Sequence, residues 1–288
     1  GPDQIQVTIN SYALTANNIT YGVAGASMKY WNFYPAPAGM GRIPVWGFGT
    51  VTKSAHAQVP VGERLYGYWP MSNEAVLTIG RVSPASLMET SAHRADLAAV
   101  YNTYARVSAD PTIPAGSEPF VSLIRPLFTT SFLIDDFLAA KGFFGAGLVL
   151  ITSASSKTAI GLADCLKRRG PGRPEIVGLT SEGNAAFVAG LGIYDRVVGY
   201  DAIDSLRAPG GAIVVDMAGG AATLRAIHTT FGEDLRYSCR VGLTQWQALR
   251  HAILPQALRN VVPAMMNNVV SLQKDVALVS VLGVREAV

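Results

Sequence analysis

Two patterns of apolar and polar residues follow one another along the chain. From residue 1 to about 120, short β-branched and aromatic runs are separated by Gly and Pro, which is typical of strands joined by turns. Residues 4–14 alternate apolar and polar positions, as a half-buried strand does, and 41–55 and 61–71 are further strand candidates. Residues 91–107 predict a helix with Ser91 as its N-cap. We expect a small β-rich unit.

After about residue 120 the pattern changes to strands that alternate with helices. Residues 132–142 predict a helix, and apolar runs at 148–152, 175–181, 195–201 and 212–220 predict strands. Helical patterns at 158–167, 184–192 and 221–232 lie after these strands. Such alternation indicates parallel βαβ units, so the expected fold class is α/β with helices on both faces of an open parallel sheet.

Length and composition narrow the class of protein. The 288 residues suit two domains, and 49% hydrophobic against 15% charged residues can form a sizeable core. A mean hydropathy of +0.26 raises the question of a membrane, but no run approaches about 18 apolar residues. We therefore expect no membrane span, and a cytoplasmic protein without a signal segment. The net charge of +3 is too small to indicate a nucleic-acid partner.

The segment Ser153 to Thr158 joins a predicted strand to a predicted helix, where phosphate-binding turns occur. Lys157 and Thr158 match the last two positions of a P-loop, but the two glycine positions hold Ile151 and Ser156. A loop without these glycines cannot wrap a triphosphate. We reject the P-loop interpretation.

A dinucleotide turn of the Rossmann type is the second interpretation of this segment. Ser153, Ser155 and Ser156 stand where glycines are expected, and the small Ala159 follows where helix and strand pack closely. Serine hydroxyls and the Lys157 ammonium can contact phosphate through side chains. The alternative is an ordinary turn in a sheet that has lost its cofactor, and the residues leave both open.

Long segments of the chain resemble one uncharacterised family of unknown function, which is itself similar to the quinone oxidoreductase branch of the medium-chain dehydrogenase/reductases. They include "LTANNITY", "YWNFYPAP", "IPVWGFGTV", "ERLYGYWPM", "LIRPLFTTSFLIDDFL", "SASSKTAIGLA" and "LGIYDRVVGYD". The resemblance runs from the first residues to about 246. It implies a GroES-like β-rich domain at 1–120, followed by a Rossmann-like domain at 121–246 that binds NADP or NAD.

The resemblance also implies roles for individual residues in cofactor binding. It places the pyrophosphate at the turn, the adenosine ribose at the end of the second strand, the nicotinamide half at the end of the fourth, and a further contact where the Rossmann domain begins. The implied residues are Ser153, Ser155, Ser156, Lys157 and Thr158, then Thr180 and Ser181, then Asp216 and Gly219, then Thr129 and Thr130. An acidic side chain at the end of the second strand favours NAD and a basic one favours NADP. Here the hydroxyls of Thr180 and Ser181 are followed by Glu182, so the choice between the two cofactors stays open.

For catalysis the resemblance points to Asn18 and Tyr21, which match residues that face the nicotinamide. Tyr21 is then the proton or hydrogen-bond donor to a substrate carbonyl, with Asn18 orienting it. The alternative is a structural polar cluster at a strand end. The β-rich domain has no cysteine, so no zinc is expected. The implied function is a zinc-independent NAD(P)H-dependent oxidoreductase that acts on a carbonyl or an activated alkene of a small molecule, and a homodimer is one arrangement left open.

The last segment resembles a different family. Residues from about 242 to 288, "GLTQWQALRHAILPQALRNVVPAMMNNVVSLQKDVALVSVLGV" followed by four more, are similar to the C-terminal part of a polar amino-acid ABC transporter permease. We expect a helical tail at 247–288 that closes an incomplete sheet. Two other functions therefore remain open: a non-catalytic dehydrogenase-like scaffold without cofactor, and a fragment or fusion related to such a permease.

Overall fold

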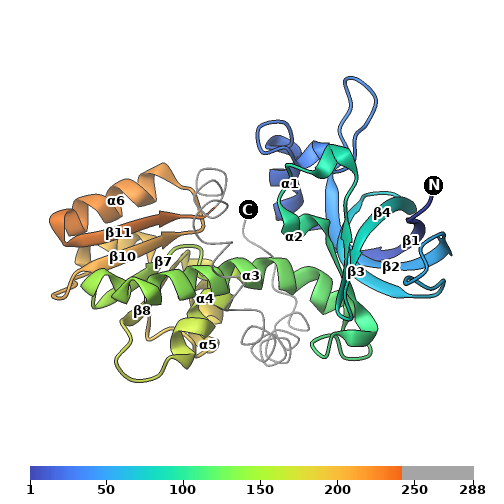
Figure 1. The fold of residues 1–288 in the computed structure, drawn as a ribbon. Helices are drawn as coiled ribbons and strands as arrows, with labels where there is room; N and C mark the ends of the chain where they lie inside the picture. Colours follow the sequence, from blue (N-terminus) through green and yellow to red (C-terminus); the bar gives the residue numbers. More distant parts are fainter. Residues whose placement is uncertain (242–288) are drawn as a thin grey trace. The chain divides into compact units, whose positions relative to one another are not determined.

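The computed structural model describes residues 1–241, which form two compact units (Figure 1). Unit 1 ends at Pro126 and unit 2 begins at Leu127, so the boundary lies inside helix α3 (Glu118–Ala140). The predicted tail at 247–288 lies outside the described residues. Within residues 1–241 no helix is both long and apolar enough to cross a membrane.

Unit 1 is a closed barrel of antiparallel strands with the order β1-β2-β3-β6-β5-β4. The bounds are β1 Gln4–Tyr12, β2 Pro44–Ser54, β3 Arg64–Pro70, β4 Glu74–Val82, β5 Ser86–Glu89 and β6 Thr103–Arg106. Alternate residues of each strand fill the barrel, including Val45 and Trp69. Their neighbours Trp46 and Tyr68 therefore lie on the outer face, where they stand opposite each other in the register. The β-rich unit expected from the sequence is confirmed.

Short helical segments lie outside the barrel strands. They are α1 Ala16–Val23, η1 Tyr30–Asn32, η2 Ala92–Arg94, α2 Ala99–Asn102 and η3 Val107–Ala109. The helix predicted at 91–107 is wrong. Residues from Thr103 onward form β6, which pairs with β3 and β5. Ser91 is the N-cap residue of η2, but its hydroxyl donates to Glu89 and makes no capping bond to that helix.

Unit 2 contains a parallel five-stranded sheet with the order β11-β10-β7-β8-β9. The strands are β7 Leu148–Ile151, β8 Glu175–Thr180, β9 Arg196–Gly199, β10 Ala212–Asp216 and β11 Leu235–Arg240. The helices are α4 Lys157–Arg168, α5 Glu182–Gly190 and α6 Ala221–Phe231, with η4 Gly142–Gly145, η5 Tyr200–Ser205 and η6 Gly232–Asp234 between elements. The α/β class and the parallel sheet are confirmed, whereas β11 was not predicted.

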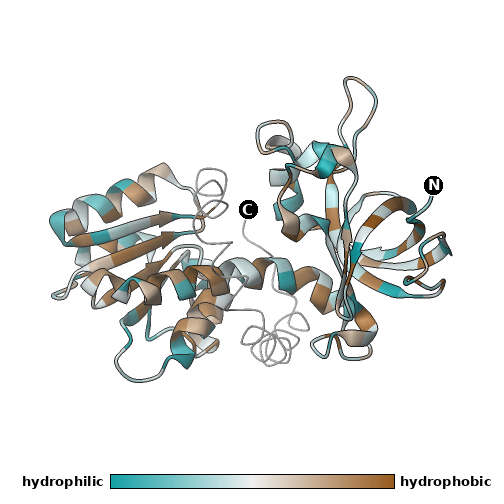
Figure 2. Cartoon of the chain, in the orientation of Figure 1, coloured by the Kyte–Doolittle hydropathy of each residue, from teal (hydrophilic) through white to brown (hydrophobic). Residues whose placement is uncertain are grey.

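The central strands of the sheet in unit 2, β7 and β10, are buried on both faces. Val149 and Ile151 of β7 pack with residues of α3, α4 and α5 on one face, and Leu148 and Leu150 pack with α6 and η5 on the other. Figure 2 shows the apolar colour concentrated along these strands. Burial on both faces explains why the strand sequences are continuous apolar runs rather than alternating ones.

Candidate functional site

The strand order of unit 2 reverses between β7 and β10, at the middle of the sheet. From β7 the chain continues to β8 and β9 on one side, and it then returns to β10 and β11 on the other. In open parallel sheets the carboxyl ends of the strands at such a switch point form the ligand site. The two segments that meet there are the turn after Ile151 and the turn after Asp216.

Ser153 adopts the backbone conformation of a glycine. Its φ is +46°, in the left-handed region that residues with a side chain rarely occupy. Three contacts hold the turn: the Ser153 N–H donates to the Tyr200 hydroxyl at 2.9 Å, the Ala154 N–H to the Leu179 carbonyl at 3.0 Å, and the Tyr194 hydroxyl to the Ala154 carbonyl at 2.8 Å. The glycine-free segment therefore keeps the shape of a glycine turn.

The other predicted residues of this turn have distinct positions. Ser156 is the N-cap of α4, and its hydroxyl accepts the Ala159 N–H at 3.4 Å. The Ser155 hydroxyl accepts from the Asn184 amide at 3.3 Å. Lys157 is half-buried and is the first residue of α4, whereas Thr158 uses its carbonyl to accept from Ser131 at 2.7 Å.

Two donors of the turn stay available within the described chain. The backbone N–H groups of Ser155 and Thr158 donate to no group in residues 1–241. They lie at the start of a twelve-residue helix, α4, whose dipole favours negative charge at that end. The turn therefore presents two unpaired backbone N–H groups at the positive end of a helix dipole.

Asp216 is buried, and its carboxylate organises the turn that follows β10. It accepts the Thr152 hydroxyl at 2.7 Å, the Ala218 N–H at 3.1 Å and the Gly219 N–H at 3.2 Å. Gly219 has a φ of +69°, which a side chain would strain. These contacts join the carboxyl ends of β7 and β10, so Asp216 and Gly219 fix the backbone of the turn at the switch point.

The remaining predicted cofactor residues lie at other strand and helix ends of unit 2. Thr180 is the last residue of β8 and is buried, and the exposed Ser181 is the N-cap residue of α5. Thr129 and Thr130 are half-buried residues of α3. The structure therefore brings Thr180 and Ser181 to the same sheet edge as the turn.

In unit 1, Asn18 and Tyr21 lie on the short helix α1. The Asn18 amide oxygen accepts the Thr15 N–H at 2.7 Å, and its NH₂ group donates to the Pro44 carbonyl at 3.1 Å. Asn18 thus caps α1 and ties it to the barrel. The amide that reaches the Tyr21 hydroxyl belongs to Asn17, at 3.1 Å.

The Tyr21 hydroxyl oxygen also accepts from Trp46 Nε1 at 3.3 Å. Both contacts use the oxygen as an acceptor, so within residues 1–241 the phenolic proton has no acceptor. Burial raises the pKa of Tyr21 well above its usual range, and the group stays protonated at neutral pH. The hydroxyl is therefore oriented and able to donate.

Sequence reasoning missed several residues of both regions. Thr152 and Tyr200 fix the turn of unit 2 through contacts more than 40 residues away in the sequence. Tyr66 and Tyr68 lie close to Tyr21 and Trp46 in unit 1. The only sequence signal was the alternation of aromatic residues with Gly in two neighbouring strands. Among the described residues no group of three or more His, Cys, Asp or Glu could hold a metal ion.

Solved reductases share this fold. A putative NADPH:quinone reductase from Mesorhizobium loti aligns with a TM-score of 0.54 at 13% identity, over 95% of this chain and 76% of that one. A mutant enoyl thioester reductase from Candida tropicalis aligns with a TM-score of 0.52 at 9% identity, over 95% of this chain and 80% of its own. An Etr1p mutant in complex with NADP and crotonyl-CoA aligns with a TM-score of 0.53 at 9% identity, over 96% of this chain and 80% of its own. The barrel followed by the parallel sheet is thus the fold of these quinone and enoyl reductases.

The chain itself belongs to the family described as "Protein of unknown function (DUF2855)", which matches residues 12–281. This match continues beyond residue 246, where the resemblance seen in the sequence was expected to end. Curated permeases match shorter parts: YxeN of Bacillus subtilis is 41% identical over 61 residues, 21% of this chain and 27% of its own length. GlnP of Escherichia coli is 33% identical over 85 residues, which are 30% of this chain and 36% of its own length. The chain therefore spans about a quarter to a third of the length of these relatives.

Proposed function

We propose that the protein is an NAD(P)H-dependent oxidoreductase that reduces a carbonyl or an activated alkene of a small molecule. The observation that carries the proposal is the turn after β7: Ser153 holds a glycine conformation at the switch point, and two N–H groups at the start of α4 remain available. The fold shared with a putative NADPH:quinone reductase and with an Etr1p mutant in complex with NADP supports the same cofactor class.

Ser153 to Thr158 hold the pyrophosphate, and Thr180 and Ser181 contact the adenosine ribose. When bound, the dinucleotide supplies the hydride. Tyr21 donates its proton or a hydrogen bond to the substrate oxygen, because its oxygen is already fixed by Asn17 and Trp46. Asn18 acts through α1, which it caps. No zinc is needed, and residues 1–126 contain no cysteine that could bind one.

Titration of NADPH and of NADH into the purified chain, followed by the fluorescence of the reduced cofactor, tests the proposal. We expect saturable binding and a Lys157→Ala variant that binds about tenfold more weakly, because its ammonium pairs with phosphate. Lys53→Ala is the matched control, since Lys53 is exposed on β2 in unit 1. No binding of either cofactor at millimolar concentration would overturn the proposal.

One observation favours a second candidate, a dehydrogenase-like scaffold that does not bind the cofactor. The Ser153 N–H, which a pyrophosphate could approach, is already bonded to the Tyr200 hydroxyl. The same titration separates the two candidates, because the scaffold binds neither NADPH nor NADH.

A further inference from the structure

The phenolic oxygen of Tyr21 lies between two N–H donors that come from different elements of unit 1. The Asn17 amide donates to it at 3.1 Å and Trp46 Nε1 at 3.3 Å. Asn17 and Tyr21 are four residues apart on α1, so their side chains lie on the same face of that helix. Trp46 belongs to β2. Two donors aimed at one oxygen are an arrangement that stabilises negative charge on it.

Contacts between α1 and β2 fix the places of the two donors. The Ala13 N–H, just before the helix, donates to the Trp46 carbonyl at 3.0 Å. Within the helix, the Asn18 NH₂ group donates to the Pro44 carbonyl at 3.1 Å. The barrel therefore holds the helix beside the strand, and both donors are in place before any charge forms on the Tyr21 oxygen.

The Tyr21 ring is packed among aromatic rings, whereas both of its donors are half-buried. The ring lies 4.7 Å from that of Tyr30 and 5.5 Å from that of Tyr68, and Asn17 and Trp46 are of intermediate exposure. Burial and the neighbouring Tyr30 raise the pKa of Tyr21. The bonds from Trp46 and Asn17 act in the opposite direction. The two donors therefore favour the charged form of the phenol against its surroundings.

The other titratable groups that interact with Tyr21 in unit 1 are tyrosines of β3 and α2. They are Tyr66, Tyr68 and Tyr101, and burial raises the pKa of each. All three therefore stay neutral at neutral pH and supply no positive charge. Among these neighbours, the N–H groups of Asn17 and Trp46 are the ones that can hold a negative charge on the Tyr21 oxygen.

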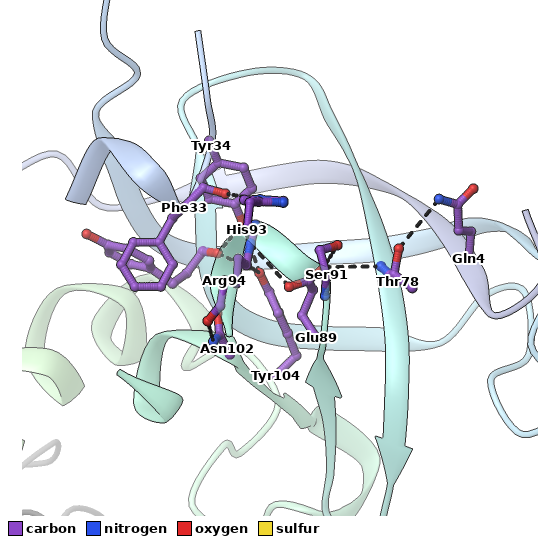
Figure 3. Close-up of polar contacts among 11 residues, drawn as sticks. Gln4, Phe33, Tyr34, Thr78, Glu89, Ser91, His93, Arg94, Asn102 and Tyr104 are labelled. Carbon is purple, nitrogen blue, oxygen red and sulfur yellow. Dashed lines mark hydrogen bonds and ion pairs between the residues drawn. The ribbon is translucent and has the colours of Figure 1, made fainter. Parts of the chain in front are cut away.

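A second tyrosine cluster of unit 1 uses its hydroxyl protons inside the protein. The Tyr34 and Tyr104 hydroxyls donate to the Tyr68 carbonyl at 2.5 and 2.9 Å. Figure 3 shows Arg94 beside Tyr34 and Tyr104, and Arg94 donates to the Tyr104 hydroxyl at 3.3 Å. The Tyr21 proton, by contrast, has no acceptor within residues 1–241. It is therefore available for transfer.

We propose that Asn17 and Trp46 are positioning residues that hold the negative charge left on the Tyr21 oxygen when its proton is transferred. The proposal rests on the proposed function, in which that proton goes to the substrate oxygen. The O–H bond of Tyr21 breaks, its electron pair stays on the phenolic oxygen, and a new O–H bond forms on the substrate that has received the hydride. A proton from water then restores the hydroxyl. Tyr21 thus gives up its proton completely instead of only sharing it in a hydrogen bond.

A pH titration of the full chain, with Tyr21 replaced by 3,5-difluorotyrosine and followed by fluorine NMR, tests the proposal. The fluorine atoms make the phenol more acidic, so it ionises at a lower pH than tyrosine does. We expect Trp46→Phe and Asn17→Ala each to raise the pKa of this phenol by about one pH unit, because each removes one donor from the charged oxygen. The sample contains neither cofactor nor substrate, so a failure of nicotinamide binding does not affect the result.

Trp69→Phe is the matched control, because Trp69 is fully buried in the barrel and its Nε1 donates to the Gly47 carbonyl at 2.9 Å. It removes an indole N–H bond but should leave the pKa of the phenol unchanged. An unchanged pKa in either Trp46→Phe or Asn17→Ala would overturn the proposal. An equal rise in Trp69→Phe would overturn it as well, since the effect would then come from altered packing.

Discussion

The hydroxyl of Thr152 joins the ends of β7 and β10, and a Thr152→Val substitution measures what this link contributes. Thr152 is fully buried; its hydroxyl donates to Asp216 at 2.7 Å and accepts the Met217 N–H at 2.8 Å. A hydrogen bond to a charged group contributes about 1.5–3 kcal/mol, and an N–H left unpaired in the interior costs about 1–3 kcal/mol. Because valine has nearly the same shape, we expect a local destabilisation of about 3 kcal/mol.

Amide hydrogen exchange, followed by mass spectrometry on peptides that cover β10, is the assay. A loss of about 3 kcal/mol corresponds to exchange about a hundredfold faster. Thr180→Val is the matched control, because Thr180 is also buried at a strand end but its hydroxyl has no hydrogen bond in the described chain. Exchange in Thr152→Val no faster than in the control would refute the role of this hydroxyl.

Two further substitutions test ion pairs, one in each unit. Glu89→Gln leaves the buried Arg94 uncompensated, so thermal unfolding followed by tryptophan fluorescence should show a loss of about 3–5 kcal/mol in unit 1; an unchanged midpoint contradicts this. In unit 2, hydrogen bonds from Arg173 and Lys167 hold the pKa of Asp195 well below its usual range. Because the pKa of this carboxyl is lower in the folded than in the unfolded state, its ionised form stabilises the fold at any pH above the unfolded-state pKa of about 3.9. This stabilisation is lost as the pH falls further. Wild type and Asp195→Asn should therefore differ by about 1 kcal/mol in urea unfolding at pH 7, and the difference should shrink below about pH 4; a constant difference excludes this linkage.

The central strands of unit 2 could be predicted from the sequence because they are buried on both faces. Leu148–Ile151 and Ala212–Asp216 contain only residues that are buried, so their apolar runs stand out from the flanking turns. Leu235–Arg240 was missed because it is the last strand in the order of the described sheet and carries Arg236, Ser238 and Arg240. Its polar residues break the apolar run on which the prediction depends.

The helix predicted at 91–107 is wrong because strand pairing with distant residues outweighs the local helical pattern. Leu97, Ala98 and Ala99 favour a helix, but the structure keeps only Ala99–Asn102 as an α-helical turn. The next residues pair with β3 and β5, and Tyr104 fills the barrel beside Trp69 at 4.6 Å. Strand pairing and burial of Tyr104 outweigh helix propensity here.

The place of the candidate site was predictable, but its contacts were not. A turn between an apolar strand and a helix marks Ser153 to Thr158 from local sequence alone. The partner of the Ser153 N–H is Tyr200, 47 residues later, and such a pair follows only from the packing of the sheet. The same holds for Tyr66 and Tyr68, whose shared face with Trp46 depends on the β2–β3 register.

The strained turn and its unpaired N–H donors bear on both candidate functions. A residue with a side chain in the left-handed region costs about 1–2 kcal/mol relative to the right-handed one. Ser153 is held there without a ligand by the bond from its own N–H to Tyr200 and by the bond from Tyr194 to the neighbouring Ala154 carbonyl. Strain alone therefore does not require a cofactor. The Tyr200 contact, however, uses only the donor at the end of β7. The N–H groups of Ser155 and Thr158 lie at the start of α4 and remain unpaired within the described chain. Under the proposed function a phosphate binds these two N–H groups while Tyr200 keeps Ser153 in place. The Tyr200 contact is therefore compatible with both candidates, and the cofactor titration distinguishes them.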